Sequence, residues 1–147
     1  MIRIAEKKDI EIITEYNLKM AEETEGLKLE EGVVRNGVRQ GLMDPARATY
    51  YVYEIDEKVV GQLMITKEWS DWRNGEFWWL QSVYVAESYR HQGIFRDLYD
   101  YVRKLAESDA NVCGMRLYVE KNNKTAQETY KKLGMEETHY LLYEDSK

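Results

Sequence analysis

The chain has 147 residues, 44% of them hydrophobic and 33% charged, a composition that predicts one globular domain over residues 1–147. Its formal net charge of −6 argues against a general nucleic-acid-binding protein, whose surface is normally basic. No apolar run approaches the roughly 18 residues of a membrane span, no secretory signal opens the chain, and a single cysteine, Cys113, excludes an internal disulfide. We therefore expect a cytoplasmic protein with no membrane or nucleic-acid partner.

The first elements in chain order are a strand and two helices. Residues 2–5 have the pattern of a short strand, and Asp9 is placed to cap a helix that runs to about Ala21. The acidic segment 22–26 is expected to break that helix. A second helix is predicted over residues 30–42, which Asp44-Pro45 ends.

The pattern then changes to that of a sheet. Residues 50–55 and 59–66 are rich in aromatic and β-branched side chains and flank a tight connection, which predicts a hairpin. Residues 69–75 are expected to form a loop or turn. Residues 77–85 are almost continuously apolar, as in a central strand that is covered on both faces.

The last third alternates between helices and strands. Helices are predicted over residues 93–108 and 123–133, with Gly134 as the stop of the second. Strands are predicted over residues 115–119 and 138–143. The order β-α-α-β-β-β-α-β-α-β predicts an α/β (α+β) fold whose 77–119 crossover is parallel and right-handed.

The segment Arg90-His91-Gln92-Gly93-Ile94-Phe95 lies where the central strand gives way to a helix. A helix N-terminus offers unpaired N–H groups and partial positive charge, and Gly93 lets a backbone approach a ligand closely. Arg90 and Arg96 flank it, so it could hold a pyrophosphate. Alone the signal is weak, because a single glycine after a strand is most often a turn residue, and neither a Rossmann nor a P-loop fingerprint is present.

A second pattern, Asn123-x-x-Ala126-x-x-x-Tyr130-x-x-x-Gly134-Met135, opens and closes the next helix. Ala126 and Tyr130 share one helix face. A phenol has a reference pKa of about 10 and stays protonated at pH 7, so Tyr130 could donate a proton to a departing thiolate. Alone, this pattern would more often be a core helix with a tyrosine at its margin.

Together the two segments resemble the GCN5-related N-acetyltransferase (GNAT) superfamily. Its members have Arg/Gln-x-x-Gly-x-Gly/Ala on the loop before the third long helix, and many have Asn-x-x-Ala-x-x-x-Tyr-x-x-x-Gly-Phe on the following helix. The matching residues are Arg90, Gly93, Asn123, Ala126, Tyr130 and Gly134. Phe95 and Met135 depart from the pattern, the first in place of a small residue and the second in place of Phe.

The resemblance implies a single-domain GNAT-like fold with a mixed six- to seven-stranded sheet and about four helices. It also implies an N-acetyltransferase that moves an acetyl group from acetyl-CoA directly to a primary amine, with no metal. The strand Val83-Tyr84-Val85 fits the strand that pairs with the pantetheine arm in that family. The residues expected to bind the cofactor are Val83, Tyr84, Val85, Arg90, His91, Gln92, Gly93, Ile94, Phe95, Arg96, Asn123, Ala126 and Tyr130.

For the chemistry, the resemblance makes Tyr130 the general acid, and Glu76 is a candidate general base beside Asp71 and Glu120. In the polyamine-acetylating branch of the family an acidic pair stands where this chain has Gln81-Ser82. The acceptor is expected to lie opposite the cofactor, between the first two helices and the 69–75 loop. Its predicted binding residues are Trp69, Asp71, Trp72 and Gln81, because rings and acids suit a small cationic amine or a peptide amine.

Two alternatives of other classes stay open at this point. One is a non-catalytic acyl-CoA binding or sensing domain with the same fold, and the other is an interaction module that merely retains it. A homodimer is also possible, since exposed rings and acids serve interfaces about as often as substrate pockets.

Overall fold

The computed structural model describes all residues from 1 to 147, which form two compact units, Met1–Leu117 and Tyr118–Lys147. The first unit contains β1 (Ile2–Ile4), η1 (Lys7–Asp9), α1 (Ile10–Glu25), α2 (Glu31–Met43), β2 (Thr49–Ile55), β3 (Lys58–Ser70), β4 (Gly75–Val85), η2 (Glu87–Tyr89), α3 (Ile94–Ser108) and β5 (Val112–Arg116). The second unit contains α4 (Lys124–Lys132). No helix is both long and apolar enough to cross a membrane.

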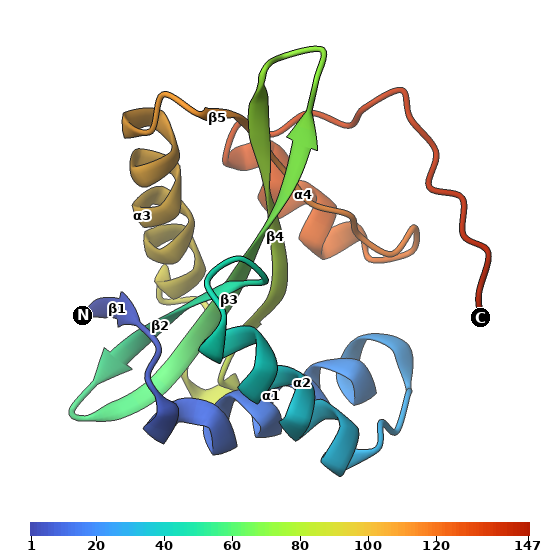
Figure 1. The fold of residues 1–147 in the computed structure, drawn as a ribbon. Helices are drawn as coiled ribbons and strands as arrows, with labels where there is room; N and C mark the ends of the chain where they lie inside the picture. The colour runs from blue at the N-terminus through green and yellow to red at the C-terminus, as the bar shows by residue number, and fades with distance from the viewer. The chain divides into compact units, whose positions relative to one another are not determined.

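The strands form one mixed sheet in the order β1-β2-β3-β4-β5 (Figure 1). Neighbouring strands from β1 to β4 are antiparallel, and β4 and β5 are parallel. The predicted α+β class, four α-helices and parallel 77–119 crossover are therefore confirmed. The predicted number of strands is corrected from six or seven to five.

Helices cover both faces of this sheet within the first unit (Figure 1). Successive residues of a strand point to opposite faces of the sheet. Gly61 and Gln62, two successive residues of β3, therefore show which helix covers each face. A Cβ on Gly61 would lie 2.8 Å from Ile94 of α3, whereas the side chain of Gln62 donates to Asn17 of α1. The α3 helix thus lies on one face and α1 on the other.

The structure corrects two predictions about the ends of α1. The side chain of Asp9 does not cap α1; it accepts hydrogen bonds from the Glu6 N–H and from Arg3. The predicted break at residues 22–26 occurs only at its last residue, because the helix continues through the acidic residues to Glu25 and ends at Gly26 in the left-handed conformation. Glutamates tolerate a helix well, so glycine is the residue that stops it.

The last predicted strand, over residues 138–143, is also absent. A strand is defined by backbone pairing with a neighbour, and in the structure these residues have no neighbouring strand. The preceding strand, β5, lies at Val112–Arg116, a few residues before the predicted 115–119. The alternation of side chains identified a strand there but not its limits.

A nearly buried ion pair joins the N-terminal strand to the start of α1, and it generates a stability prediction. Arg3 donates to the two carboxylate oxygens of Asp9 at 2.8 and 3.0 Å, with side chains 17% and 5% exposed. Burial by itself would raise the pKa of Asp9. The hydrogen bonds from Arg3 and the Glu6 N–H, with the charge of Arg3, outweigh burial and lower this pKa.

We predict that Asp9→Asn destabilises the protein by about 2 kcal/mol at pH 7, because it removes charge-assisted hydrogen bonds. A lowered folded pKa gives stability that is complete above the unfolded pKa of about 3.9 and is lost as the pH falls through the folded pKa. Urea unfolding should therefore show the gap between parent and variant closing below about pH 4. The control Glu15→Gln, in an exposed pair with Lys19, should change stability by less than about 0.5 kcal/mol.

Candidate active site

The candidate site begins at an irregularity in the middle of β4. Between the paired residues Gln62–Tyr84 and Met64–Gln81, β3 has one residue and β4 has two, so β4 contains an extra residue. Ser82 takes a positive φ of 51° there. Gln62 is fully buried, and its amide nitrogen donates to the Ser82 carbonyl at 3.1 Å and to Asn17 at 2.9 Å. A buried side chain thus fixes the bulge.

Beyond this point β4 has an open edge within the first unit. Its parallel pairing with β5 covers Glu76 to Trp79 and ends at Arg116. The segment 80–85 continues without a partner strand on that side, while on the other side the ladder to β3 continues through the Ala86 N–H, which donates to Val60 at 2.8 Å. An unpaired strand edge can bind an extended ligand through its backbone.

The loop after β4 leads into the N-terminus of α3. His91 and Gly93 both have left-handed backbones, with φ of 63° and 81°. No side chain caps α3, so the N–H groups of its first turn face the solvent end without an intrahelical acceptor. A Cβ at Gly93 would meet nothing within 4 Å, and Arg96 is exposed in the first turn. This is the geometry of an anion site.

Phe95, which replaces the small residue of the family pattern, is accommodated along α3. The ring of Phe95 lies 6.3 Å from that of Tyr99, one turn further along α3, and Tyr99 is buried. The large side chain therefore turns along the helix toward a buried ring. The helix start itself forms without the small residue that the family has at this position.

The side chain of Arg90 is engaged by the protein. Its Nε donates to the Val85 carbonyl at 2.9 Å, and its Nη2 donates to Glu23 of α1 at 2.9 Å. Its guanidinium also lies 5.2 Å from the centre of the Tyr84 ring. Arg90 thus ties the end of β4 to the last turn of α1.

A cavity of about 320 Å³ lies beside this link, between α1 and the end of β4. It is lined by Tyr16, Lys19, Glu22, Glu23, Tyr84, Ala86 and Glu87. The rings of Tyr16 and Tyr84 are 4.9 Å apart, and burial, followed by the nearby Glu23 carboxylate, raises the pKa of Tyr84.

The charges of this cavity are unevenly satisfied. Lys19 pairs with Glu15 at 2.8 Å, and Glu23 pairs with Arg90. The carboxylates of Glu22 and Glu87 have no such partner, so the cavity is negative and lined by aromatic rings.

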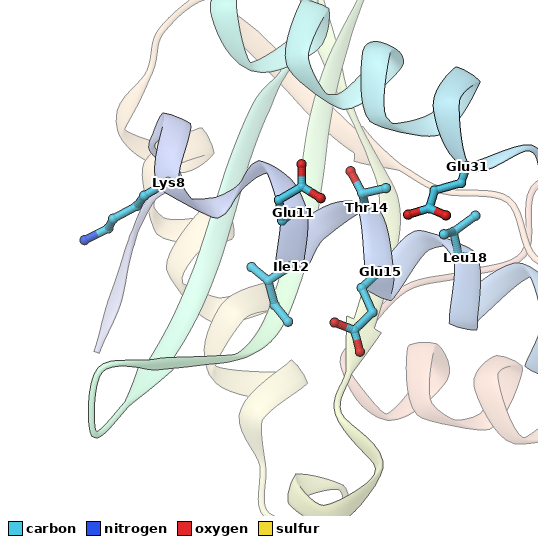
Figure 2. A pocket seen from close by; sticks show the side chains of 7 residues that line it. All are labelled: Lys8, Glu11, Ile12, Thr14, Glu15, Leu18 and Glu31. Carbon is cyan, nitrogen blue, oxygen red and sulfur yellow. The ribbon is translucent and has the colours of Figure 1, made fainter.

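Another hollow, of about 490 Å³, lies along α1 and is shown in Figure 2. Its lining residues are Lys8, Glu11, Ile12, Thr14, Glu15, Leu18 and Glu31. Arg35 donates to Glu11 at 2.9 Å and to Glu31 at 2.7 Å, and the Thr14 hydroxyl donates to the Ile10 carbonyl. These groups hold α1 against α2, and we assign this hollow no ligand.

The sequence-predicted acceptor loop lies at the opposite end of β4. Trp69 is near the end of β3, and Asp71 and Trp72 are in the turn before Gly75, with the two tryptophans 62% and 92% exposed. From Gly75 to Val85 a strand spans roughly 30 Å. The structure therefore does not bring these residues together with the 83–93 segment.

Glu76 belongs to the same distant end, opposite Trp69 and 3.9 Å from the Lys67 ammonium. Gln81 alone among the predicted acceptor residues adjoins the bulge, where its amide donates to the Thr66 hydroxyl at 2.7 Å. Sequence reasoning overlooked Asn17, Tyr16 and Gln62, since their importance comes from contacts far along the chain that no local pattern encodes.

In the second unit the predicted residues lie on α4. Asn123 is its N-cap, and its side-chain oxygen accepts a hydrogen bond from the Ala126 N–H at 3.1 Å. Ala126 and Tyr130 are one turn apart and half-buried. Burial raises the pKa of Tyr130, so its phenol is protonated at neutral pH.

Comparison with known proteins identifies the family of the chain. The model of the acetyltransferase (GNAT) family matches residues 12–135. The chain belongs to the GNAT acetyltransferase family. The predicted resemblance is thereby confirmed, and this GNAT acetyltransferase is an enzyme that acetylates with acetyl-CoA.

Comparison with solved structures supports the same family. This GNAT acetyltransferase is 46% identical to a possible acetyltransferase from Clostridium difficile 630, with a TM-score of 0.95 over 99% of this chain and 96% of that one. It shares the fold, at 18% identity and a TM-score of 0.81, of a predicted acetyltransferase with acetyl-CoA from Clostridium acetobutylicum, over 99% and 95% of the chains.

The aminoglycoside enzyme AAC(6')-Iy, in complex with the bisubstrate analogue CoA-S-monomethyl-acetylneamine, also shares the fold, at 15% identity and a TM-score of 0.78 over 100% and 97% of the chains. No curated protein matches this GNAT acetyltransferase.

Proposed function

We propose that this GNAT acetyltransferase moves the acetyl group of acetyl-CoA to the primary amine of a cationic acceptor, either a small molecule or a peptide. The observation that supports this most is the negative, tyrosine-lined cavity beside the end of β4. It adjoins the strand segment that suits the cofactor, so a donor and an acceptor side meet at one place.

For the cofactor we propose the residues expected from the sequence, with the exception of Arg90, whose guanidinium is engaged by the Val85 carbonyl and Glu23. Backbone groups of Val83, Tyr84 and Val85 on the open edge suit the pantetheine arm. The start of α3, from His91 to Arg96, suits the pyrophosphate through its N–H groups and the Arg96 charge. Asn123 and Ala126, at the start of α4, are the further cofactor residues that we propose.

Bound acetyl-CoA supplies the acetyl group as a thioester. We assign to Tyr130 the proton that its hydroxyl gives to the departing sulfur. Its raised pKa suits an acid, because the phenol keeps its proton until it is needed. We assign no base to Glu76, since it lies at the far end of β4.

We propose that the acceptor amine binds in the cavity between α1 and the end of β4. A primary ammonium would gain from the carboxylates of Glu22 and Glu87 and from the faces of Tyr16 and Tyr84. AAC(6')-Iy, which shares the fold, was solved with an analogue that joins CoA to an acetylneamine. That example is compatible with a polar amine acceptor in this fold.

An amine panel tests the proposed function. The protein is incubated with acetyl-CoA and cationic, neutral and anionic amines, and free thiol is followed over time. We expect turnover with cationic primary amines. Binding of acetyl-CoA with no turnover on any amine would instead support the alternative, a non-catalytic acyl-CoA sensing domain.

We predict that Gly93→Val weakens acetyl-CoA binding by about tenfold or more, measured by calorimetry. The branched side chain disfavours the left-handed backbone and intrudes on the open space at the helix start. Gly26→Val is the matched control, because Gly26 also has a positive φ and open space but lies at the end of α1. Equal affinity in the parent and Gly93→Val would remove this loop from the cofactor site.

We predict that Tyr130→Phe lowers kcat by about 10²- to 10⁴-fold, the span of general acid catalysis, with little change in acetyl-CoA affinity. The variant keeps the ring and loses the donor. Tyr118→Phe, an exposed tyrosine of the same unit, is the control and should retain full activity. A Tyr130→Phe enzyme as fast as the parent would rule out the acid assignment.

We predict that Glu22→Gln raises KM for a cationic acceptor about twofold to fivefold and changes kcat little, since it removes the charge pair that Glu22 would form with the acceptor ammonium. The effect should shrink with added salt. Asp71→Asn, at the hairpin tip, is the matched control and should leave KM unchanged. The reverse result, a raised KM for Asp71→Asn alone, would place the acceptor at the hairpin loop that was predicted from the sequence.

A further inference from the structure

One short stretch of β3 supports both sides of the candidate site. The Tyr16 hydroxyl of α1, which lines the cavity, donates to the Val59 carbonyl. The Ala86 N–H, directly after β4, donates to the Val60 carbonyl at 2.8 Å. The wall of the proposed acceptor cavity and the end of the proposed cofactor strand are therefore tied to neighbouring residues of β3.

Gln62, two residues further along β3, joins the two sides directly. Its side chain is fully buried, and its amide nitrogen donates to the Asn17 side chain of α1 at 2.9 Å and to the Ser82 carbonyl of β4 at 3.1 Å. A side-chain amide nitrogen has two N–H donors, so these two contacts use both of them. An apolar side chain of the same length would fill the space and leave both acceptors without this donor.

Ser82 is the point at which this contact can affect the cofactor strand. Its φ of 51° is uncommon for a residue other than glycine, and such a conformation persists where the surrounding structure holds it. The extra residue of the bulge also shifts the following residues of β4 relative to β3. Val83 to Val85, the proposed pantetheine edge, follow directly, so the bulge determines where that edge lies.

We propose that Gln62 is a positioning residue for acetyl transfer: it holds the Val83–Val85 edge and the α1 wall of the cavity at the separation that the reaction needs. The inference rests on the proposed function and adds a residue that touches neither ligand in that assignment. Acyl transfer requires the amine within about 3–3.5 Å of the thioester carbon, and a misplacement of about 1 Å can lower the rate about 10²-fold. A contact that fixes the two sides relative to each other thus affects the rate more than the binding of either ligand.

Gln62→Met removes both donors and keeps the length of the side chain. We expect kcat to fall about 10²-fold. The Kd of acetyl-CoA, measured by calorimetry, and the KM of the acceptor should change less than about threefold, because the groups that bind each ligand are kept. An unchanged kcat, or a loss of acetyl-CoA affinity as large as the loss of kcat, would overturn the proposal.

Thr14→Val is the matched control for this variant. Thr14 is also buried and lies on α1, but its hydroxyl donates to the Ile10 carbonyl of the same helix. The control therefore loses a buried hydrogen bond without loosening β4, and it should keep the kcat of the parent. A fall in kcat as large as that of Gln62→Met would show that any buried polar loss slows the enzyme, and would refute the positioning role.

A double-mutant cycle tests whether the rate depends on the contact between the two side chains. Asn17→Ala should lower kcat about threefold to tenfold in the parent, the effect of one hydrogen bond. It should have almost no further effect in the Gln62→Met background, where the contact is already lost. Equal effects in the two backgrounds would refute the proposed route. If urea unfolding shows that Gln62→Met does not fold, Asn17→Ala, at a half-buried site, is judged alone by the same kcat and Kd criteria.

The conformation of Ser82 gives a readout that does not need turnover. The Cα chemical shift of Ser82 depends on its backbone angles, so it should change in Gln62→Met and stay at the parent's value in Thr14→Val. A parent that acetylates no amine would refute the proposed function and this inference with it. An active parent whose Gln62→Met variant keeps the Ser82 shift would refute the inference alone.

Discussion

The candidate site depends on one buried glutamine. Gln62 reaches from β3 to the bulge of β4 and to Asn17 of α1, so three elements meet at its amide nitrogen. It holds Ser82 in a left-handed backbone, and β4 continues past the end of β5 with one open edge.

Residues around the same end of β4 also determine how charge is distributed in the candidate site. Arg90, expected from the sequence to face a phosphate, is held by Glu23 and the Val85 carbonyl. Under the proposed function the anion then depends on the N–H groups of the α3 start and on Arg96. Glu23, which pairs with Arg90, also lines the cavity that contains the unpaired carboxylates of Glu22 and Glu87.

Local patterns in the sequence were sufficient for most of the elements. The helix over residues 94–108 has an apolar stripe of period 3.6, and the central strand is apolar over most of residues 77–85, so both elements form where they can bury those side chains. Asn123 as a cap of α4 and the motif glycine at the start of α3 follow from similarly short-range chemistry. Tertiary structure decided what depends on distant partners: Asp9 binds Arg3 instead of capping α1, and Trp69 and Asp71 lie a strand length from the cofactor loop. It also decided that residues 138–143 form no strand in one chain, because a strand exists only with a neighbour to pair with.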